Sequence, residues 1–297
     1  MTGPPRILTD DDIRERLTPA LAVDAARRAL VDAAAGTLVA PPRRHAEVGD
    51  VELAFTIGGY AGGIAGFRAY GTWAGDSDQA TLVWSAAGEL LGLVVGWELG
   101  ARRTGALGAA AAGALARPGP ADVAVVGSGR QAWTQLWALT AGVEIREVRV
   151  YSPTGDHRAA FAARAGAELG LDARAVGSPE DAVRGAGVVI LATRSRTPVI
   201  EASWVAPGAH VTTVGPKAAS ASETPTELAD LASVAVSDSP EQAVAYGQPF
   251  FTDRPLVHLG AVLDGRGPGR TGDDEVTLYC STGLAGSEVV MAEALLR

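Results

Sequence analysis

The sequence has 297 residues, of which 47% are hydrophobic and 20% charged, so it has enough apolar material for a sizeable core and enough length for two domains. Its formal net charge of −9 argues against nucleic acids and anionic membranes as partners, because both would repel it. Cys280 is the single cysteine, which excludes an intrachain disulfide. The start has no apolar signal-peptide core and no apolar run reaches the about 20 residues of a membrane span, so we expect a cytoplasmic protein.

The first zone, residues 1–117, mixes helices and strands. Apolar residues at helical spacing predict a helix over Thr18–Gly36, and a run of small residues predicts a tightly packed helix over Arg103–Leu115. Between them, Val51–Ile57 and Ala80–Val95 are typical of strands, with Gly58-Gly59 predicted as a turn.

The second zone, residues 121–250, alternates short strands with helices. The predicted strands are Val123–Val126, Glu147–Tyr151, Val188–Ala192, His210–Val214 and Val234–Val236. Helices are predicted between most of them, for example over Gln131–Ala141 and Arg158–Leu169. This alternation predicts an α/β fold with a doubly wound parallel sheet of the Rossmann type.

The third zone, residues 251–297, is a loop-rich return with a predicted strand at Val276–Cys280 and a closing helix at Ser287–Arg297. We expect it to pack back onto the first zone. The predicted division is therefore a Rossmann domain at residues 118–270 and a discontinuous mixed α/β domain at residues 1–117 and 271–297.

A glycine-rich turn follows the first strand of the second zone. It has the pattern Gly-x-Gly-x-x-Ala, formed by Gly127, Gly129 and Ala132. Gly127 permits the tight turn, Gly129 lets the backbone approach a pyrophosphate, and Ala132 lets the helix pack on the strand. Backbone amides at the helix start attract phosphates. We therefore expect a nicotinamide dinucleotide to bind here, at Gly127, Ser128, Gly129, Arg130 and Gln131.

The next strand ends without the acidic residue that usually accepts a hydrogen bond from the 2′-hydroxyl of NAD. Ser152, Thr154 and Arg158 lie there instead. Hydroxyls and a guanidinium suit a 2′-phosphate, so the sequence favours NADP(H) over NAD(H).

Several segments of the sequence match segments of a known family and follow one another in the same order as in that family. One is the segment from Arg103 to Ala106, which precedes the glycine-rich turn. Three further segments also match the family: Pro42-Arg43, Pro207 to Gly215 and Gly269 to Leu284. The sequence thereby resembles the ornithine cyclodeaminase/μ-crystallin family from about residue 40 to the C-terminus.

The resemblance implies a homodimer whose first domain binds substrate and mediates dimerisation. It also implies hydride transfer between nicotinamide and a carbon bearing an amine or an imine.

The resemblance also transfers individual residues. Arg43 and Arg103 match arginines that bind the substrate carboxylate, a task that suits a guanidinium fork. Thr104 matches a contact to the cofactor phosphate. Ser281 falls where the family has a small polar residue near the nicotinamide. We also expect the cofactor to contact Thr193, in the loop after a predicted strand, and Val214.

Two positions depart from the family pattern. Arg68 stands where the family has an active-site lysine, and since arginine keeps its proton it is better suited to hold a carboxylate than to shuttle a proton. Lys217 stands where cyclodeaminases place an acidic residue, which makes cyclodeaminase activity doubtful. Lys217 is predicted to donate a proton to the imine or to serve as a second carboxylate anchor. Alternatively, Glu223 and Glu227, which follow it, neutralise its charge. We count Lys217 and Arg68 as the candidate catalytic residues.

The four histidines are scattered, so we expect no metal site. The function that the sequence favours is an NADP-dependent oxidoreductase acting on CH–NH or C=N bonds, which reduces a cyclic ketimine or an imine formed from a 2-oxo acid and an amine. The alternatives are a cyclodeaminase-like lyase with bound NAD and a non-catalytic NADPH-binding protein of the crystallin type.

Overall fold

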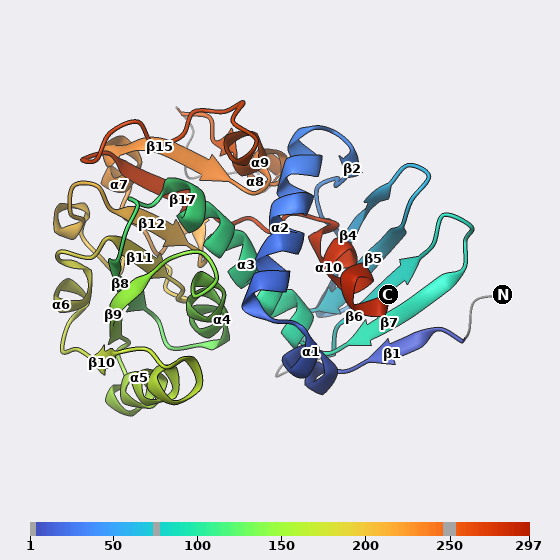
Figure 1. The fold of residues 1–297 in the computed structure, drawn as a ribbon, viewed down its shortest axis with the longest axis horizontal. Helices are drawn as coiled ribbons and strands as arrows, with labels where there is room; N and C mark the ends of the chain where they lie inside the picture. Colours follow the sequence, from blue (N-terminus) through green and yellow to red (C-terminus); the bar gives the residue numbers. More distant parts are fainter. Residues whose placement is uncertain (1–3, 74–77, 246–253) are drawn as a thin grey trace.

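Two β-sheets, with long helices between them, form the framework of the molecule (Figure 1). The structure is a computed structural model, and it describes residues 4–73, 78–245 and 254–297. One sheet lies at the right in Figure 1 and the other at the left, with α2 (Pro19–Ala34) and α3 (Glu98–Leu115) between them.

The first sheet has seven strands in the order β1-β7-β6-β5-β4-β2, with β3 also paired to β4. Only the β1–β7 pair is parallel. The strands are β1 (Arg6–Leu8), β2 (Leu38–Val39), β3 (Arg44–Val48), β4 (Val51–Tyr60), β5 (Ala65–Gly71), β6 (Ala80–Trp84) and β7 (Leu90–Val95).

Helices cover one face of this sheet. Alongside α2 and α3 these are α1 (Asp10–Arg16) and the C-terminal α10 (Ser287–Leu296), which lies directly on β4 to β7. Thr18 caps α2 by accepting a hydrogen bond from the Leu21 amide at 3.2 Å, and Pro19 opens its first turn. The helix predicted from Arg103 begins earlier, at Glu98.

The second sheet has eight parallel strands in the order β10-β9-β8-β11-β12-β17-β15-β16. They are β8 (Ala121–Val126), β9 (Ile145–Tyr151), β10 (Ala173–Ala175), β11 (Val188–Leu191), β12 (His210–Thr213), β15 (Ala232–Ser237), β16 (Val257–His258) and β17 (Val276–Cys280). The order reverses between β8 and β11, which is the switch point of a doubly wound fold. The predicted Rossmann fold with a second α/β unit is confirmed.

Shorter elements complete the second lobe. They are α4 (Arg130–Leu139), α5 (Gly155–Leu169), α6 (Pro179–Val183), η1 (Ala202–Trp204), β13 (Lys217–Ala218), β14 (Ala221–Ser222), α7 (Glu227–Leu231), α8 (Pro240–Ala245) and α9 (Leu259–Leu263). The small residues of α3 allow it to lie close to α4: a Cβ at Gly105 would collide with the backbone of Thr134.

Two expectations need correction. Gly58 and Gly59 do not form a turn but continue β4, where they pair with Gly66 and Ala65. A Cβ at Gly58 would collide with Gly286 at the start of α10, so the glycine is there to let the backbones approach.

The second correction concerns Val276–Cys280, which we grouped with the first domain. This strand is β17, and it pairs with β12 on one side and β15 on the other, inside the parallel sheet. Only the part of the C-terminal segment after this strand, above all α10, returns to the first sheet. A closing strand of five buried residues cannot be assigned to either sheet from its own sequence.

Candidate active site

A cavity of about 820 Å³ lies between the two sheets. Its lining includes nine of the predicted site residues, drawn from both lobes: Arg43, Arg68, Arg103, Thr104, Arg130, Gln131, Val214, Lys217 and Ser281. The other predicted residues are in the loops that follow β8, β9 and β11, at the same edge of the parallel sheet, except Arg158, which lies in the first turn of α5.

The glycine-rich turn lies between β8 and α4, as predicted. Gly127 has a φ of 121°, and a Cβ there would collide with the carbonyl of Ala192, so this glycine is required by the fold itself. Gly129 is different: its φ of −87° suits any residue, and a Cβ would meet no described atom within 4 Å. The open space over Gly129 fits a pyrophosphate lying against the backbone at the start of α4.

Arg130 connects the two lobes at this point. Its guanidinium carbon lies 4.6 Å from the centre of the Trp97 ring, at the start of α3. Thr104, in the second turn of α3, donates its hydroxyl to the carbonyl of Gly100 at 2.9 Å.

The segment after β9 lies beside the glycine-rich turn, because Tyr151 pairs with Val126. Ser152 Oγ donates to the Thr154 carbonyl at 3.3 Å, and Arg158 Nη1 donates to the Ser152 carbonyl at 2.8 Å. The structure thus places these three predicted residues in one cluster.

A buried carboxylate organises the loops after β11 and β12. Glu223 accepts hydrogen bonds from the amide and hydroxyl of Thr193, both at 2.8 Å, from the Thr213 hydroxyl at 2.8 Å and from the amides of Val214 and Gly215 at 3.1 and 2.6 Å. Its side chain therefore fixes backbone that lines the cavity, a role that the sequence did not suggest.

Asp238 does the same for the loop after β17. It accepts from the amide and hydroxyl of Thr282 at 2.8 Å each, and from the amides of Gly283 and Leu284 at 2.8 and 3.0 Å. Asp238 itself follows directly after β15, the neighbouring strand. Sequence reasoning missed it, although an acidic residue at the carboxyl end of a parallel strand is a recognisable pattern.

The three predicted substrate arginines face the cavity from the first lobe. Arg68 is in β5, Arg103 is in α3 and Arg43 lies just before β3. A Cβ added to Gly283 would lie 2.8 Å from Arg43 Nη2 and 3.2 Å from Arg103 Nη1, so these two guanidiniums converge below that loop. The carbon of the Arg68 guanidinium lies 4.4 Å from the centre of the Tyr70 ring.

Glu288, at the start of α10, is a fully buried counter-ion for this cluster. Its Oε1 accepts from Arg68 Nη1 at 2.9 Å and from Arg103 Nη2. Burial raises the pKa of the Glu288 carboxyl, but the guanidiniums of Arg103 and Arg68 outweigh this and lower it. The sequence analysis missed Glu288, although an acidic residue in an otherwise apolar predicted helix is unusual enough to notice.

The arginines differ in how many of their N–H donors have a hydrogen-bond partner. Arg68 Nε donates to Gln79 Oε1 at 3.0 Å, and its Nη2 contacts the same oxygen. Burial lowers the pKa of Arg68, and Glu288 opposes that shift. Arg103 is 3% exposed, and its Nε and Nη1 are buried with no hydrogen-bond partner among the described residues. Such unmatched donors beside a cavity indicate a site for an anionic oxygen.

Lys217 lies on the opposite wall. Its Nζ donates to the carbonyls of Gly215 at 2.6 Å, Ser281 at 2.8 Å and Val214 at 3.2 Å. Glu223 was an alternative partner for Lys217, but its carboxylate oxygens accept hydrogen bonds from backbone amides and hydroxyl groups.

Other chemistry finds little support in the described part of the chain. It contains no group of three or more His, Cys, Asp and Glu side chains able to hold a metal ion. Burial raises the pKa of the Cys280 thiol to about 12, so this cysteine stays protonated and is a poor nucleophile. Within residues 4–73, 78–245 and 254–297, no helix has the length and apolar character needed to cross a membrane.

The role assigned to Glu288 gives a stability prediction. Glu288→Gln leaves two buried guanidiniums facing a neutral amide, so we expect it to lower the free energy of unfolding by about 3–5 kcal/mol, measured by urea denaturation. Glu168→Gln is the matched control, because Glu168 pairs with Arg164 at the surface and is 53% exposed. Equal losses in the two variants would contradict the role of Glu288.

Comparisons with known proteins agree with this geometry. The chain is 34% identical to a putative dehydrogenase of Rhizobium meliloti over 64% of its own length, a match that spans 60% of that relative. It is 32% identical to a Delta(1)-pyrroline-2-carboxylate reductase of Bacillus cereus, over 70% of this chain and 67% of the relative. Among solved structures, an archaeal alanine dehydrogenase dimer with bound NAD superposes with a TM-score of 0.89 at 27% identity, covering 98% of this chain and 95% of that one.

The family model matches almost the whole chain. It is described as the ornithine cyclodeaminase/mu-crystallin family, and it covers residues 5–296. The glycine-rich turn, the arginines and the two-sheet fold therefore come together in a chain that belongs to the ornithine cyclodeaminase/mu-crystallin family.

Proposed function

We propose that this protein is an oxidoreductase that reduces an imine with NADPH, the imine carbon being bonded to a carboxylate. The observation that carries the proposal is the arginine cluster in one cavity with Arg130 and Gln131, which directly follow the glycine-rich turn, and Arg103 keeps two buried donors there without a partner among the described residues. A relative named for pyrroline-2-carboxylate reduction supports the same substrate class.

The chain offers a complete set of contacts for the dinucleotide. The backbone of Gly127, Ser128 and Gly129, with Arg130 and Gln131 at the start of α4, would hold the pyrophosphate, and Thr104 would add a hydroxyl. A bound nicotinamide cofactor supplies a hydride. The nicotinamide ring would lie among Thr193, Val214 and Ser281, because the loops that carry these residues begin at the edge of the sheet where β8 ends.

NADPH rather than NADH is proposed from the segment after β9. No acidic residue directly follows this strand, since Asp156 comes only after the turn, and the polar groups there include Ser152, Thr154 and Arg158. The Arg158 guanidinium is already held close to Ser152, which would reduce the ordering needed to bind a 2′-phosphate.

The arginines would bind and orient the substrate. Arg43 and Arg103 converge from two elements, which suits a carboxylate held by two guanidiniums. Arg68 keeps its charge where a lysine would be able to lose it, so its part is to bind the carboxylate and not to transfer a proton. The carboxylate would thereby fix the neighbouring imine carbon in one orientation.

Turnover tests this proposal. We expect oxidation of NADPH, followed by absorbance, with cyclic imine carboxylates or with 2-oxo acids plus ammonia, and a higher KM for NADH. Arg103→Met is expected to lower kcat/KM about tenfold to a hundredfold, because it removes charge-assisted hydrogen bonds to the substrate.

Arg102→Met is the matched control for this experiment. The neighbouring Arg102 is directed elsewhere, to Glu98 and the Leu17 carbonyl, and lies on the Trp137 ring. Its loss is expected to change kcat/KM much less. Absence of turnover with every substrate, or equal losses in the two variants, would refute the proposal.

We also propose that the protein is a homodimer joined through the first sheet. The face turned away from α10 carries an apolar row that crosses five strands. Register places Ile7, Leu93, Leu82, Phe67 and Ile57 side by side in it.

Exposure supports a second copy on this face. Ile7 is 67% exposed and Ile57 48% exposed, and an uncovered apolar face of this kind is typical of an interface. We expect sedimentation to give a dimer for the wild type and a monomer for Ile57→Glu, which would bury two charges at the interface. A monomeric wild type would exclude this arrangement.

A further inference from the structure

The chain has a single lysine. Of its 25 Lys and Arg residues, Lys217 alone is lysine, and it lies in the wall of the cavity. Arginine serves at every other basic position, including the three that face the substrate site. Lys217 is therefore the exception among the basic residues of this chain, and its contacts indicate what distinguishes it from an arginine.

The hydrogen bonds of Lys217 show this difference from an arginine. Three carbonyl oxygens, those of Val214, Gly215 and Ser281, lie 2.6 to 3.2 Å from Nζ. An ammonium group has three donors that diverge from one atom, whereas a guanidinium is a flat fork. Only the ammonium can use its whole donor set on three carbonyls gathered around one point.

These carbonyls belong to two different loops. Val214 and Gly215 follow β12 and are fixed by Glu223, while Ser281 follows β17 and leads into the turn fixed by Asp238. β12 and β17 are neighbours in the sheet, so their loops leave the same edge side by side. Lys217 is the side chain that bonds one loop to the other.

We propose that Lys217 is a positioning residue: it ties the loop after β12 to the loop after β17 and so fixes the wall on which the nicotinamide rests, and it does not donate its proton to the substrate. This inference rests on the proposed function for the identity of the ligand. The contacts that define it lie within the protein.

Hydrogen bonding, and not charge, favours a protonated ammonium at Lys217. Burial lowers the pKa of Lys217, and the carboxylates of Glu223 and Asp238 offset that shift only in part. The three carbonyl acceptors favour the ammonium form as well, because the neutral amine has one donor fewer. A proton given to substrate would leave one of these carbonyls without its hydrogen bond.

A spectroscopic experiment on the wild-type protein tests the inference without any variant. Labelling with ¹⁵N-lysine gives one side-chain nitrogen signal, because there is one lysine. We expect an ammonium signal with slowed hydrogen exchange that does not titrate between about pH 6 and pH 9, with or without NADPH. A nitrogen that titrates together with the alkaline limb of the kcat/KM profile would overturn the inference.

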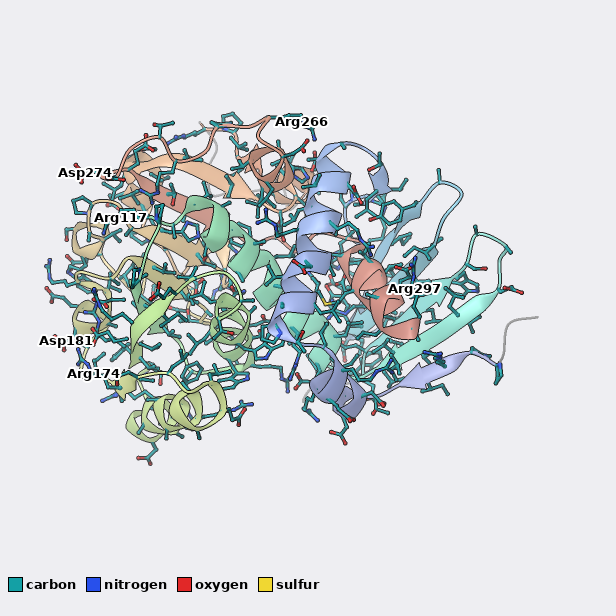
Figure 2. All side chains as sticks on the ribbon, viewed as in Figure 1. Arg117, Arg174, Asp181, Arg266, Asp274 and Arg297 are labelled. Atoms are coloured by element: carbon teal, nitrogen blue, oxygen red, sulfur yellow. The ribbon has the colours of Figure 1, made fainter. Side chains whose placement is uncertain are left out.

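Kinetics of variants provide the second test. For both Lys217→Met and Lys217→Arg we expect the KM for NADPH to rise about tenfold, because neither restores the three bonds, while the pH profile of kcat/KM keeps its shape. Arg266→Met is the control, since Arg266 is exposed at the outer rim and pairs with Asp264 (Figure 2). It is expected to leave the KM unchanged.

The outcomes separate the two proposals. Loss of the alkaline limb in Lys217→Met, or a wild-type KM in Lys217→Arg, would overturn the positioning role while leaving imine reduction in place. A wild-type protein that reduces no imine would refute the proposed function, and the nitrogen signal would still show whether Lys217 holds the two loops together.

Discussion

The site depends on one constraint, the parallel alignment of β8, β11, β12 and β17. Parallel neighbours end at the same edge, so four loops from distant parts of the chain meet there. Backbone groups in such loops have no strand partner, and those that are buried must be hydrogen-bonded elsewhere. Glu223 and Asp238 accept the amides, and Lys217 donates to the carbonyls. At the edge of the sheet beside the cavity, these charged side chains thus provide the hydrogen bonds that neighbouring strands provide inside the sheet.

On the other side of the cavity, the arginine cluster brings several positive charges close together. Guanidiniums brought together in a poorly hydrated place repel one another, and the cluster needs an anion to form. Glu288 supplies one negative charge, shared between Arg68 and Arg103. Several positive charges remain beside the cavity in a chain whose net charge is −9. That local excess suits anionic ligands, both a dinucleotide and a carboxylate.

Much of this was predictable from the sequence, because the relevant patterns are local. The glycine-rich turn follows directly from a strand and precedes a helix, and the strand–helix alternation fixes the sheet type. The family resemblance alone assigned Arg43, Arg68 and Arg103 to one predicted site, and all three line the cavity. Glu288 and Asp238 were not predicted because the arginines and the loop amides that they bind lie at least 44 positions away in the sequence, and only tertiary packing joins them. The strand β17 escaped for the same reason, since pairing and not composition assigns it to the parallel sheet. The division into domains as a whole stays a prediction.

The most direct test is calorimetric titration of NADPH and NADH into the wild-type protein and Gly129→Val. The backbone at Gly129 tolerates any side chain and has open space above it, so the variant should fold with a Tm within a few degrees of the wild type. Our account predicts that the wild type binds one dinucleotide per chain and that the valine side chain, placed where the pyrophosphate would lie, abolishes binding. A wild type that takes up neither dinucleotide, or a folded variant that binds as tightly as the wild type, would contradict it.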